Sequence, residues 1–231
     1  MNISWLNKFS LIDYPGEICC IVFTPGCNFR CGYCHNSEFV LPEKIKNIEI
    51  LKEKLFFNFL EKRKWLLTAV SICWWEPSLQ KDLLEFCRKI KNMWFLVKLD
   101  TNWRDSELIQ KLIDEKIIDY IAMDIKEDFE NFWKLSKSKE SSKKYLESIN
   151  IIIDSDIDYE FRTTVIKWFH NLKIIENIVK IINWANNYFI QNYRQWNTLE
   201  KDFEWNSFSE NELGKFKIMA SKYIKKVWIR S

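Results

Sequence analysis

Glycine is scarce in this chain of 231 residues, which contains 4 glycines but 12 tryptophans. A globular chain of this length ordinarily has roughly 7% glycine, or about 16 residues, and here glycine and tryptophan together number 16. Several tryptophans occupy turn-like positions: Trp103 follows Asn102, Trp74 and Trp75 precede Glu76-Pro77, and Trp168 begins a polar turn. Glycine suits such positions because it reaches positive φ without steric cost. Two interpretations are open: a tryptophan-rich core, or glycines encoded by UGA in a genome that reads this codon as glycine.

Long apolar runs and a large net charge are also missing. No run approaches the ~18 residues of a membrane span, and residues 1–10 lack the basic and apolar segments of a signal peptide. Lysine plus arginine (35) nearly balances aspartate plus glutamate (32), and 47% of the residues are hydrophobic. Such a composition supports a folded core. We therefore expect a cytoplasmic protein that binds neither nucleic acid nor membrane.

The seven cysteines do not suggest a disulfide framework. Their number is odd, and Cys19 and Cys20 are adjacent in an apolar stretch, where a strand would point them to opposite faces. Cys27, Cys31 and Cys34 are clustered, which in a reducing compartment indicates metal ligation.

Periodicity predicts alternating strands and helices without a low-complexity linker. The expected strands are 18–24, 69–73, 95–101, 120–125, 158–166 and 188–193, and the expected helices are 45–62, 79–91, 106–115, 142–152, 172–185 and 211–223. Apolar strands separated by helices indicate parallel pairing. We expect an α/β fold, a partial (β/α)6 barrel, because the chain is shorter than the ~250 residues of a full barrel; a doubly wound sheet is the alternative. A single domain would span 1–231, with a core at about 16–195 and a helical C-terminal extension at about 196–231.

Polar residues follow the predicted strands, at the end where α/β folds bind ligands. The residues concerned are Glu76, Asp100, Thr101, Asn102, Asp124, Lys126, Arg162 and Arg194. We expect these residues from separate segments to converge on one rim.

Cys27, Cys31 and Cys34 have the spacing C-x3-C-x2-C on a loop that contains glycine. Three thiolates can hold a 4Fe-4S cubane but bind only three of its irons. The fourth iron would remain open to a small-molecule ligand, as in catalytic metal sites. The alternatives are a structural zinc with His35 as fourth ligand and, less favoured by the spacing, a redox thiol pair.

This motif, with Tyr33 before its last cysteine, resembles the signature of radical S-adenosylmethionine (SAM) enzymes. Residues 8–16 (KFSLIDYPG), 34–36 (CHN) and 197–199 (NTL) resemble the activating proteins of anaerobic ribonucleoside-triphosphate reductase, relatives of the pyruvate formate-lyase activating enzyme. The resemblance covers nearly the whole chain. It implies an oxidoreductase that cleaves SAM reductively at a 4Fe-4S cluster and forms a glycyl radical on a partner enzyme. Electrons would come from a flavodoxin or ferredoxin.

The resemblance also bears on the tryptophans. The family has Gly-Gly-Glu-Pro where this chain has Trp74-Trp75-Glu76-Pro77, and Asp-Thr-Asn-Gly where it has Asp100-Thr101-Asn102-Trp103. Repeated replacement of glycine by tryptophan favours the interpretation that UGA codons for glycine were translated as tryptophan. If the tryptophans are genuine, the chain is instead a catalytically silent metal-binding or scaffold relative. A radical SAM enzyme that acts on another substrate is the third possibility.

Further roles are implied only by the resemblance. Residues 74–76 would contact the SAM ammonium, with Glu76 as an acceptor. Asp100, Thr101 and Asp124 would surround a monovalent cation, for which hard oxygen ligands are suitable. Lys126 and Arg194, and less strongly Arg162, would neutralise the SAM carboxylate; the family has histidine at the position of Arg194.

Overall fold

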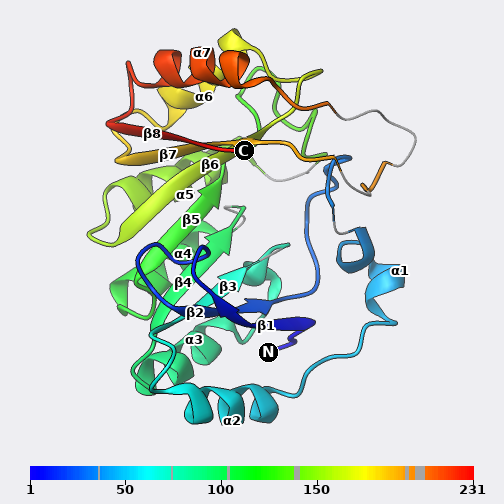
Figure 1. Cartoon of the computed structure of the whole chain (residues 1–231), viewed down its shortest axis with the longest axis vertical. Helices are drawn as coiled ribbons and strands as arrows, with labels where there is room; N and C mark the ends of the chain where they lie inside the picture. The colour runs from blue at the N-terminus through cyan, green and yellow to red at the C-terminus, as the bar shows by residue number, and fades with distance from the viewer. Residues whose placement is uncertain (36, 74, 103–104, 138–140, 196–197, 201–205) are drawn as a thin grey trace.

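The computed structural model describes residues 1–35, 37–73, 75–102, 105–137, 141–195, 198–200 and 206–231. Its centre is one eight-stranded sheet in which the strands lie side by side in chain order. The strands are β1 (Trp5–Ser10), β2 (Cys19–Phe23), β3 (Ala69–Cys73), β4 (Leu96–Thr101), β5 (Tyr120–Asp124), β6 (Asp158–Val165), β7 (Asn187–Asn192) and β8 (Lys226–Arg230). Figure 1 shows them as one curved layer that is not closed into a barrel.

The six predicted strands are confirmed as β2 to β7, and each pairs in parallel with the next. The α/β fold with a partial, open barrel is therefore confirmed. Two further strands extend the sheet: β1 pairs antiparallel with β2, and β8 pairs in parallel with β7. The apolar residues 227–229 thus belong to β8, which follows the helix expected at 211–223.

The helices are α1 (Pro42–Ile45), α2 (Glu53–Arg63), α3 (Leu83–Asn92), α4 (Ser106–Asp114), α5 (Ser142–Ile153), α6 (Leu172–Ile181) and α7 (Glu210–Ala220). The single helix predicted for 45–62 is wrong. Leu51 instead forms an antiparallel bridge with Ile3, and its N–H donates to the Ile3 carbonyl at 2.8 Å. This pairing requires extended backbone, so the helix begins only at Glu53.

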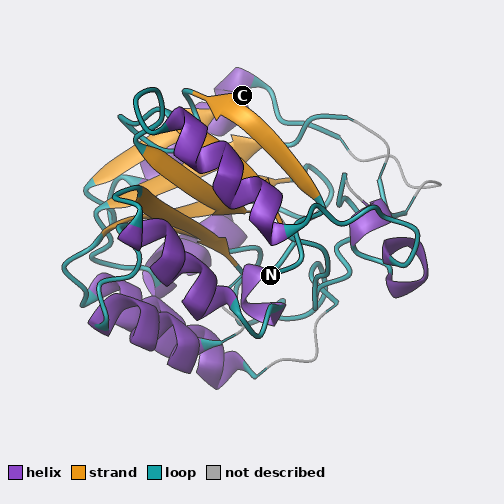
Figure 2. Cartoon of the chain, turned by 90° about the horizontal axis from the view of Figure 1, so that it is seen from below, coloured by secondary structure: helices purple, strands orange, loops and turns teal. Residues whose placement is uncertain are grey.

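The central strands are largely buried because helices cover the outer face of the curved sheet. Every residue of β2 and β3 is buried, as expected for parallel strands covered on both faces. Figure 2 shows most helices packed along the sheet, while the short helices near the cysteine loop stand apart. Cys19, Cys20, Cys73 and Cys87 are buried, and none of the seven cysteines forms a disulfide. No helix in the described segments is both long and apolar enough to cross a membrane.

Side chains alternate between the two faces of each strand, and this alternation decides which residues of β4 and β6 reach the inner face of the sheet. On β4 Lys98 and Asp100 line a cavity, and on β6 Glu160, Arg162 and Thr164 do so. Successive side chains of a strand point to opposite faces, so residues two apart share a face. The inner face of the sheet is therefore polar near the carboxyl ends of its strands, whereas the face toward the helices is apolar.

Candidate active site

A cavity of about 690 Å³ lies at the carboxyl ends of the strands. This volume is within the range of small-molecule sites. Eleven of the predicted site residues line it: Cys27, Cys31, Tyr33, Cys34, Trp75, Asp100, Thr101, Asn102, Asp124, Lys126 and Arg162. Glu76 and Arg194 are not among the lining residues, and Trp74 lies outside the described residues. The structure therefore brings most of the predicted residues together.

The cysteine loop is held by hydrogen bonds to its backbone. Gly26 has φ of 98°, a conformation that glycine adopts readily, and its N–H donates to the Phe39 carbonyl. Arg30 Nη1 donates to the carbonyl of Cys27 at 2.6 Å. At the far end of the loop, the Cys34 carbonyl accepts from the N–H of Leu199 at 3.0 Å. The loop is therefore fixed at both ends by the chain itself.

Two N–H groups are directed at one of the thiols. The backbone N–H of Phe29 donates to Cys27 Sγ at 3.3 Å, and Asn102 Nδ2 lies 3.6 Å from the same sulfur. Burial raises the pKa of Cys27 and raises the pKa of the Cys31 thiol to about 12. A bound metal reverses this effect because a coordinating thiol loses its proton. The loop thus offers thiol donors with hydrogen-bond support, a donor set that fits an iron-sulfur cluster.

The cysteine side chains face one cavity without forming a compact cage. As the described side chains stand, no group of three or more His, Cys, Asp or Glu residues is placed to hold a metal ion. His35 also lines the cavity, and its ring centroid lies 5.3 Å from that of Tyr193. Three cysteines from one loop, none of them in a disulfide, thus share the cavity with a histidine, and their residue types define the site.

Glu76 joins the ends of two strands and does not reach the cavity. Its side chain accepts hydrogen bonds from the backbone N–H of Ser78 at 3.0 Å and of Asn102 at 2.6 Å, and from Thr101 Oγ1 at 3.0 Å. Burial raises the pKa of Glu76, although these donors oppose the shift. Its oxygens accept these hydrogen bonds within the protein, so Glu76 positions the ends of β3 and β4. The SAM-acceptor role that the resemblance implied stays a prediction.

Asn102 forms an amide pair with Asn28 beside Cys27. Asn102 Nδ2 donates to Asn28 Oδ1 at 2.8 Å. Asn102 Oδ1 and Asn28 Nδ2 are buried and have no hydrogen-bond partner among the described residues. Buried polar atoms are normally satisfied. Of the two residues, Asn102 lines the cavity next to Cys27.

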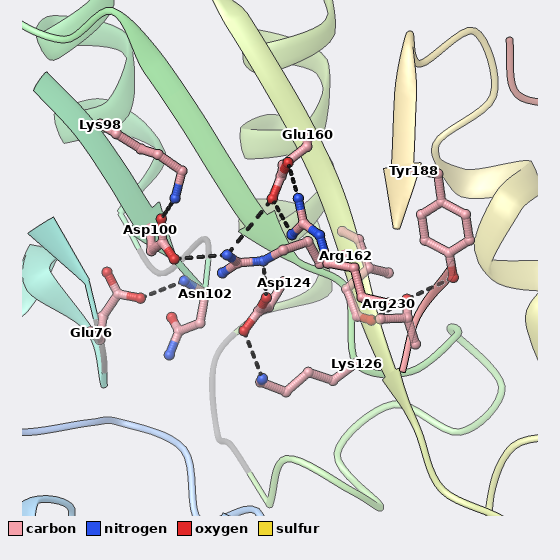
Figure 3. Close-up of polar contacts among 12 residues, drawn as sticks. Glu76, Lys98, Asp100, Asn102, Asp124, Lys126, Glu160, Arg162, Tyr188 and Arg230 are labelled. Carbon is pink, nitrogen blue, oxygen red and sulfur yellow. Dashed lines mark hydrogen bonds and ion pairs between the residues drawn. The ribbon is translucent and has the colours of Figure 1, made fainter. Parts of the chain in front are cut away.

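Charged side chains form a continuous network along the inner face of the sheet (Figure 3). Arg162 donates from Nη1 to Asp100 at 2.7 Å and from Nε to Asp124 at 2.9 Å. Lys126 Nζ lies 3.2 Å from the other oxygen of Asp124, and Lys98 pairs with Asp100. The guanidinium of Arg162 thus stands between the two carboxylates that were expected to surround a cation, and the Thr101 hydroxyl is directed at Glu76.

Burial and pairing act in opposite directions on these charges. Burial would raise the pKa of Asp124, but Arg162 and Lys126 outweigh it and lower that pKa to about 2. Burial would lower the pKa of Lys126, but Asp124 raises it well above its usual value. Asp124 and Lys126 are therefore both charged at neutral pH.

The network continues to the last strand through residues that the sequence analysis missed. Arg230 donates to both oxygens of Glu160, at 2.9 and 3.0 Å, and Tyr120 donates to Glu160 at 3.0 Å. Lys98 and Glu160 precede Asp100 and Arg162 by two residues, so same-face alternation could have identified them. Arg230 had no such signal, because β8 was not predicted.

His170 is buried in the loop between β6 and α6, where it positions Lys126. Its Nδ1 accepts from the N–H of Ile166 at 3.0 Å, so Nε2 carries the proton and donates to the Lys126 carbonyl at 3.1 Å. Lys126 Nζ in turn lies 6.0 Å from the ring centroid of Tyr33, within reach of a cation–π interaction.

Arg194 is exposed and donates to the backbone carbonyl of Ser231. The structure therefore does not bring it to the cavity with Lys126 and Arg162.

Comparison with known proteins identifies the family. A model of the radical SAM superfamily matches residues 21–185, which include the cysteine loop and strands β3 to β6. The chain belongs to the radical SAM superfamily. This superfamily implies a 4Fe-4S cluster and SAM, and the three cysteines in one cavity, none of them in a disulfide, fit that requirement.

Relatives extend the match to almost the whole chain. Two proteins of Methanocaldococcus jannaschii, each named as a candidate glycyl-radical enzyme activating enzyme, are similar. The first is 34% identical over 99% of this chain and 95% of its own length, and the second 29% identical over 98% and 82%. A crystal structure of a domain of the pyruvate-formate lyase-activating enzyme from Bacteroides vulgatus superposes with a TM-score of 0.57. It is 14% identical and covers 71% of this radical SAM chain and 99% of its own, which shows a shared fold.

Proposed function

We propose that this radical SAM protein is a glycyl-radical activase that acts on an anaerobic ribonucleoside-triphosphate reductase. The observation that carries the proposal is the meeting of Cys27, Cys31 and Cys34 with Asn102 and the Arg162 network in one cavity. Similarity to two glycyl-radical activating relatives supports the class of reaction. The reductase as partner rests on the resemblance carried by residues 8–16, 34–36 and 197–199.

The three cysteines would hold the cluster. When bound, it would supply the electron for reductive cleavage of the sulfonium bond of SAM, with methionine as the leaving group and a glycine Cα as the source of the hydrogen atom that the 5′-deoxyadenosyl group takes. A flavodoxin or ferredoxin is the proposed electron donor. The protein's own task is to hold SAM beside Cys27 and to exclude competing hydrogen donors.

The polar groups near Cys27 are suited to bind the methionine end of SAM. Asn102 lines the cavity beside Cys27, and its side-chain amide is of the kind that can hydrogen-bond an ammonium or a carboxylate group. Lys126 and Arg162 line the same cavity and supply positive charge. In this proposal, Arg162 replaces the monovalent cation that the resemblance implied, because it already binds both Asp100 and Asp124.

The charge of the cavity favours a peptide as the second substrate. The acidic lining residues Asp13, Asp100, Asp124 and Glu160 are matched by the basic residues Lys98, Lys126, Arg162 and Arg230. A balanced lining offers no excess positive charge for a polyanion, whereas a glycine-bearing loop of a protein is uncharged. Phe9, Leu11 and Ile12 are exposed, and Ile12 also lines the cavity. An apolar rim of this kind suits contact with a protein.

We also propose that the protein works in the cytoplasm, since none of its seven cysteines forms a disulfide. A reducing compartment keeps such thiols available for iron.

Anaerobic reconstitution with iron and sulfide tests the proposal. We expect reductant-dependent 5′-deoxyadenosine, and a glycyl-radical electron spin resonance signal when the anaerobic reductase of the same organism is added. Cys31→Ser should abolish both signals, whereas Cys87→Ser, which alters a buried cysteine of α3, should retain them. Cleavage of SAM without a radical on the reductase would contradict the partner, and a zinc-binding protein without SAM cleavage would contradict the class.

A further inference from the structure

Four tryptophans have the backbone conformation that favours glycine. The φ angles of Trp75, Trp94, Trp133 and Trp184 are 56°, 69°, 74° and 74°. Within the described segments, the only other non-glycine residues with positive φ are two lysines. The chain has 17 phenylalanines and 8 tyrosines, yet no described phenylalanine or tyrosine has positive φ. Positive φ strains a residue with a Cβ atom. Among the described aromatic residues, positive φ therefore occurs at tryptophans and not at phenylalanines or tyrosines.

The tryptophans also do not behave as core residues. None of the eight described ones is buried, and Trp65, Trp94 and Trp184 are 98%, 93% and 81% exposed. Phenylalanine and tyrosine instead fill the interior, as Phe56, Phe86 and Tyr188 show. Tryptophan is on average highly buried in proteins. A tryptophan-rich core, one of the two interpretations of the composition, is absent from the described structure.

Trp94 shows what its position requires. It is the second residue after α3, and its N–H donates to the carbonyl of Lys91 at 2.8 Å. Helices commonly end in a left-handed residue at this position, and that residue is usually glycine. The indole points into solvent, so the position uses the backbone and not the side chain.

Trp75 lies in the active-site cavity itself. Its indole lines the cavity and stacks on Phe39, with ring centroids 4.4 Å apart. The next residue, Glu76, donates its N–H to the carbonyl of Gly26 at 3.0 Å. Gly26 has positive φ as well. Two left-handed residues thus approach each other next to the cysteine loop, where an indole takes up space in the cavity.

We infer that residues 75, 94, 133 and 184 are glycine in the protein made by its native host, because a UGA codon is read there as glycine. One decoding rule then accounts for the left-handed backbone, the exposed indoles and the low glycine content together. At residues 94, 133 and 184, which do not line the cavity, the inference is independent of the proposed function. At residue 75 it deepens that function, because glycine would enlarge the cavity beside Cys27.

The codons and the mass of the native protein test the inference directly. We expect UGA at all four positions and glycine in tryptic peptides 92–98, 127–134 and 181–194, each of which contains one of the tryptophans. UGG codons, or peptides with the mass of tryptophan, would overturn the inference whether or not the protein cleaves SAM.

A matched pair of variants tests the backbone argument in recombinant protein. Trp94 and Trp65 both stand two residues beyond the end of a helix and are almost fully exposed, but only Trp94 has positive φ. We expect Trp94→Gly to raise the melting temperature by about 2–4 °C and Trp65→Gly to leave it unchanged or lower it. No increase for Trp94→Gly would contradict the strain on which the inference rests.

The cavity provides the test for residue 75. In reconstituted protein, Trp75→Gly should lower the dissociation constant for SAM by at least about tenfold, while Trp5→Gly, on the outermost strand, should not change it. Unchanged SAM binding in Trp75→Gly would contradict enlargement of the cavity. If neither the unmodified protein nor Trp75→Gly binds SAM, the proposed function fails. The codon and mass results then still decide the inference.

Discussion

The Glu76 carboxylate accepts a hydrogen bond from the backbone N–H of Asn102 at 2.6 Å, which ties the segment after β3 to the end of β4. Two residues that were both expected at the rim of the site therefore have different positions. Asn102 faces the cavity, and Glu76 holds it in position from behind.

Glu76→Ala should destabilise the fold and displace Asn102. The substitution leaves the N–H groups of Ser78 and Asn102 and the hydroxyl of Thr101 without their acceptor, so we expect a loss of about 2–4 kcal/mol in the free energy of unfolding. Glu76→Gln keeps an acceptor and should lose less. Chemical denaturation measures both values, and equal losses in the two variants would contradict the role of the acceptor.

His170 predicts a pH dependence of stability. Burial lowers its pKa from 6.5 to about 4, although two backbone hydrogen bonds oppose the shift. A base whose pKa is lower in the folded state contributes stability above pH 6.5 and loses it as the pH falls toward 4. Relative to His170→Gln, the wild type should lose about 2–3 kcal/mol over this window. His35 is present in both proteins and cancels, and parallel pH profiles would contradict the prediction.

Arg162 predicts that the reaction does not depend on a monovalent cation. Because its guanidinium bridges Asp100 and Asp124, SAM cleavage should proceed equally in sodium, potassium and tetramethylammonium salts. Arg162→Ala should weaken SAM binding at least about tenfold, and potassium should restore part of the loss. A wild-type rate that requires potassium would show that a cation, and not Arg162, bridges Asp100 and Asp124 during the reaction.

Asn102 predicts a shift in the reduction potential of the cluster. Hydrogen bonds to a cysteine sulfur stabilise the more reduced state of a cluster, and Asn102 Nδ2 is 3.6 Å from Cys27 Sγ. Asn102→Ala should therefore move the potential to a more negative value in a redox titration. Asn177→Ala, which removes a hydrogen bond to Asp128 elsewhere in the fold, should not move it.

The parts of the fold that could be predicted from sequence are those with strong local patterns. β2 to β7 are apolar runs bounded by polar segments, and C-x3-C-x2-C is a local motif. β1 was missed because most of its residues are exposed, and α2 was predicted too long because the pairing of Leu51 with Ile3 is a long-range contact.

The site was predicted less completely, for a related reason. Proximity to the end of a strand identified Asp100, Asp124 and Arg162, but it cannot tell on which side of the strand a side chain lies. Glu76 therefore appeared equivalent to Asn102. Arg194 has the right type and place in the sequence, yet it points away from the cavity, and Arg230 on the unpredicted β8 takes part in the network instead.

The most direct test of the account measures 5′-deoxyadenosine in anaerobically reconstituted protein, with and without a one-electron reductant. The account predicts that the product forms only with the reductant, and that Cys27→Ser, Cys31→Ser and Cys34→Ser each abolish it. If SAM remains intact after reduction, or if any of the three variants retains full activity, the three thiols do not hold the cluster that carries out this chemistry.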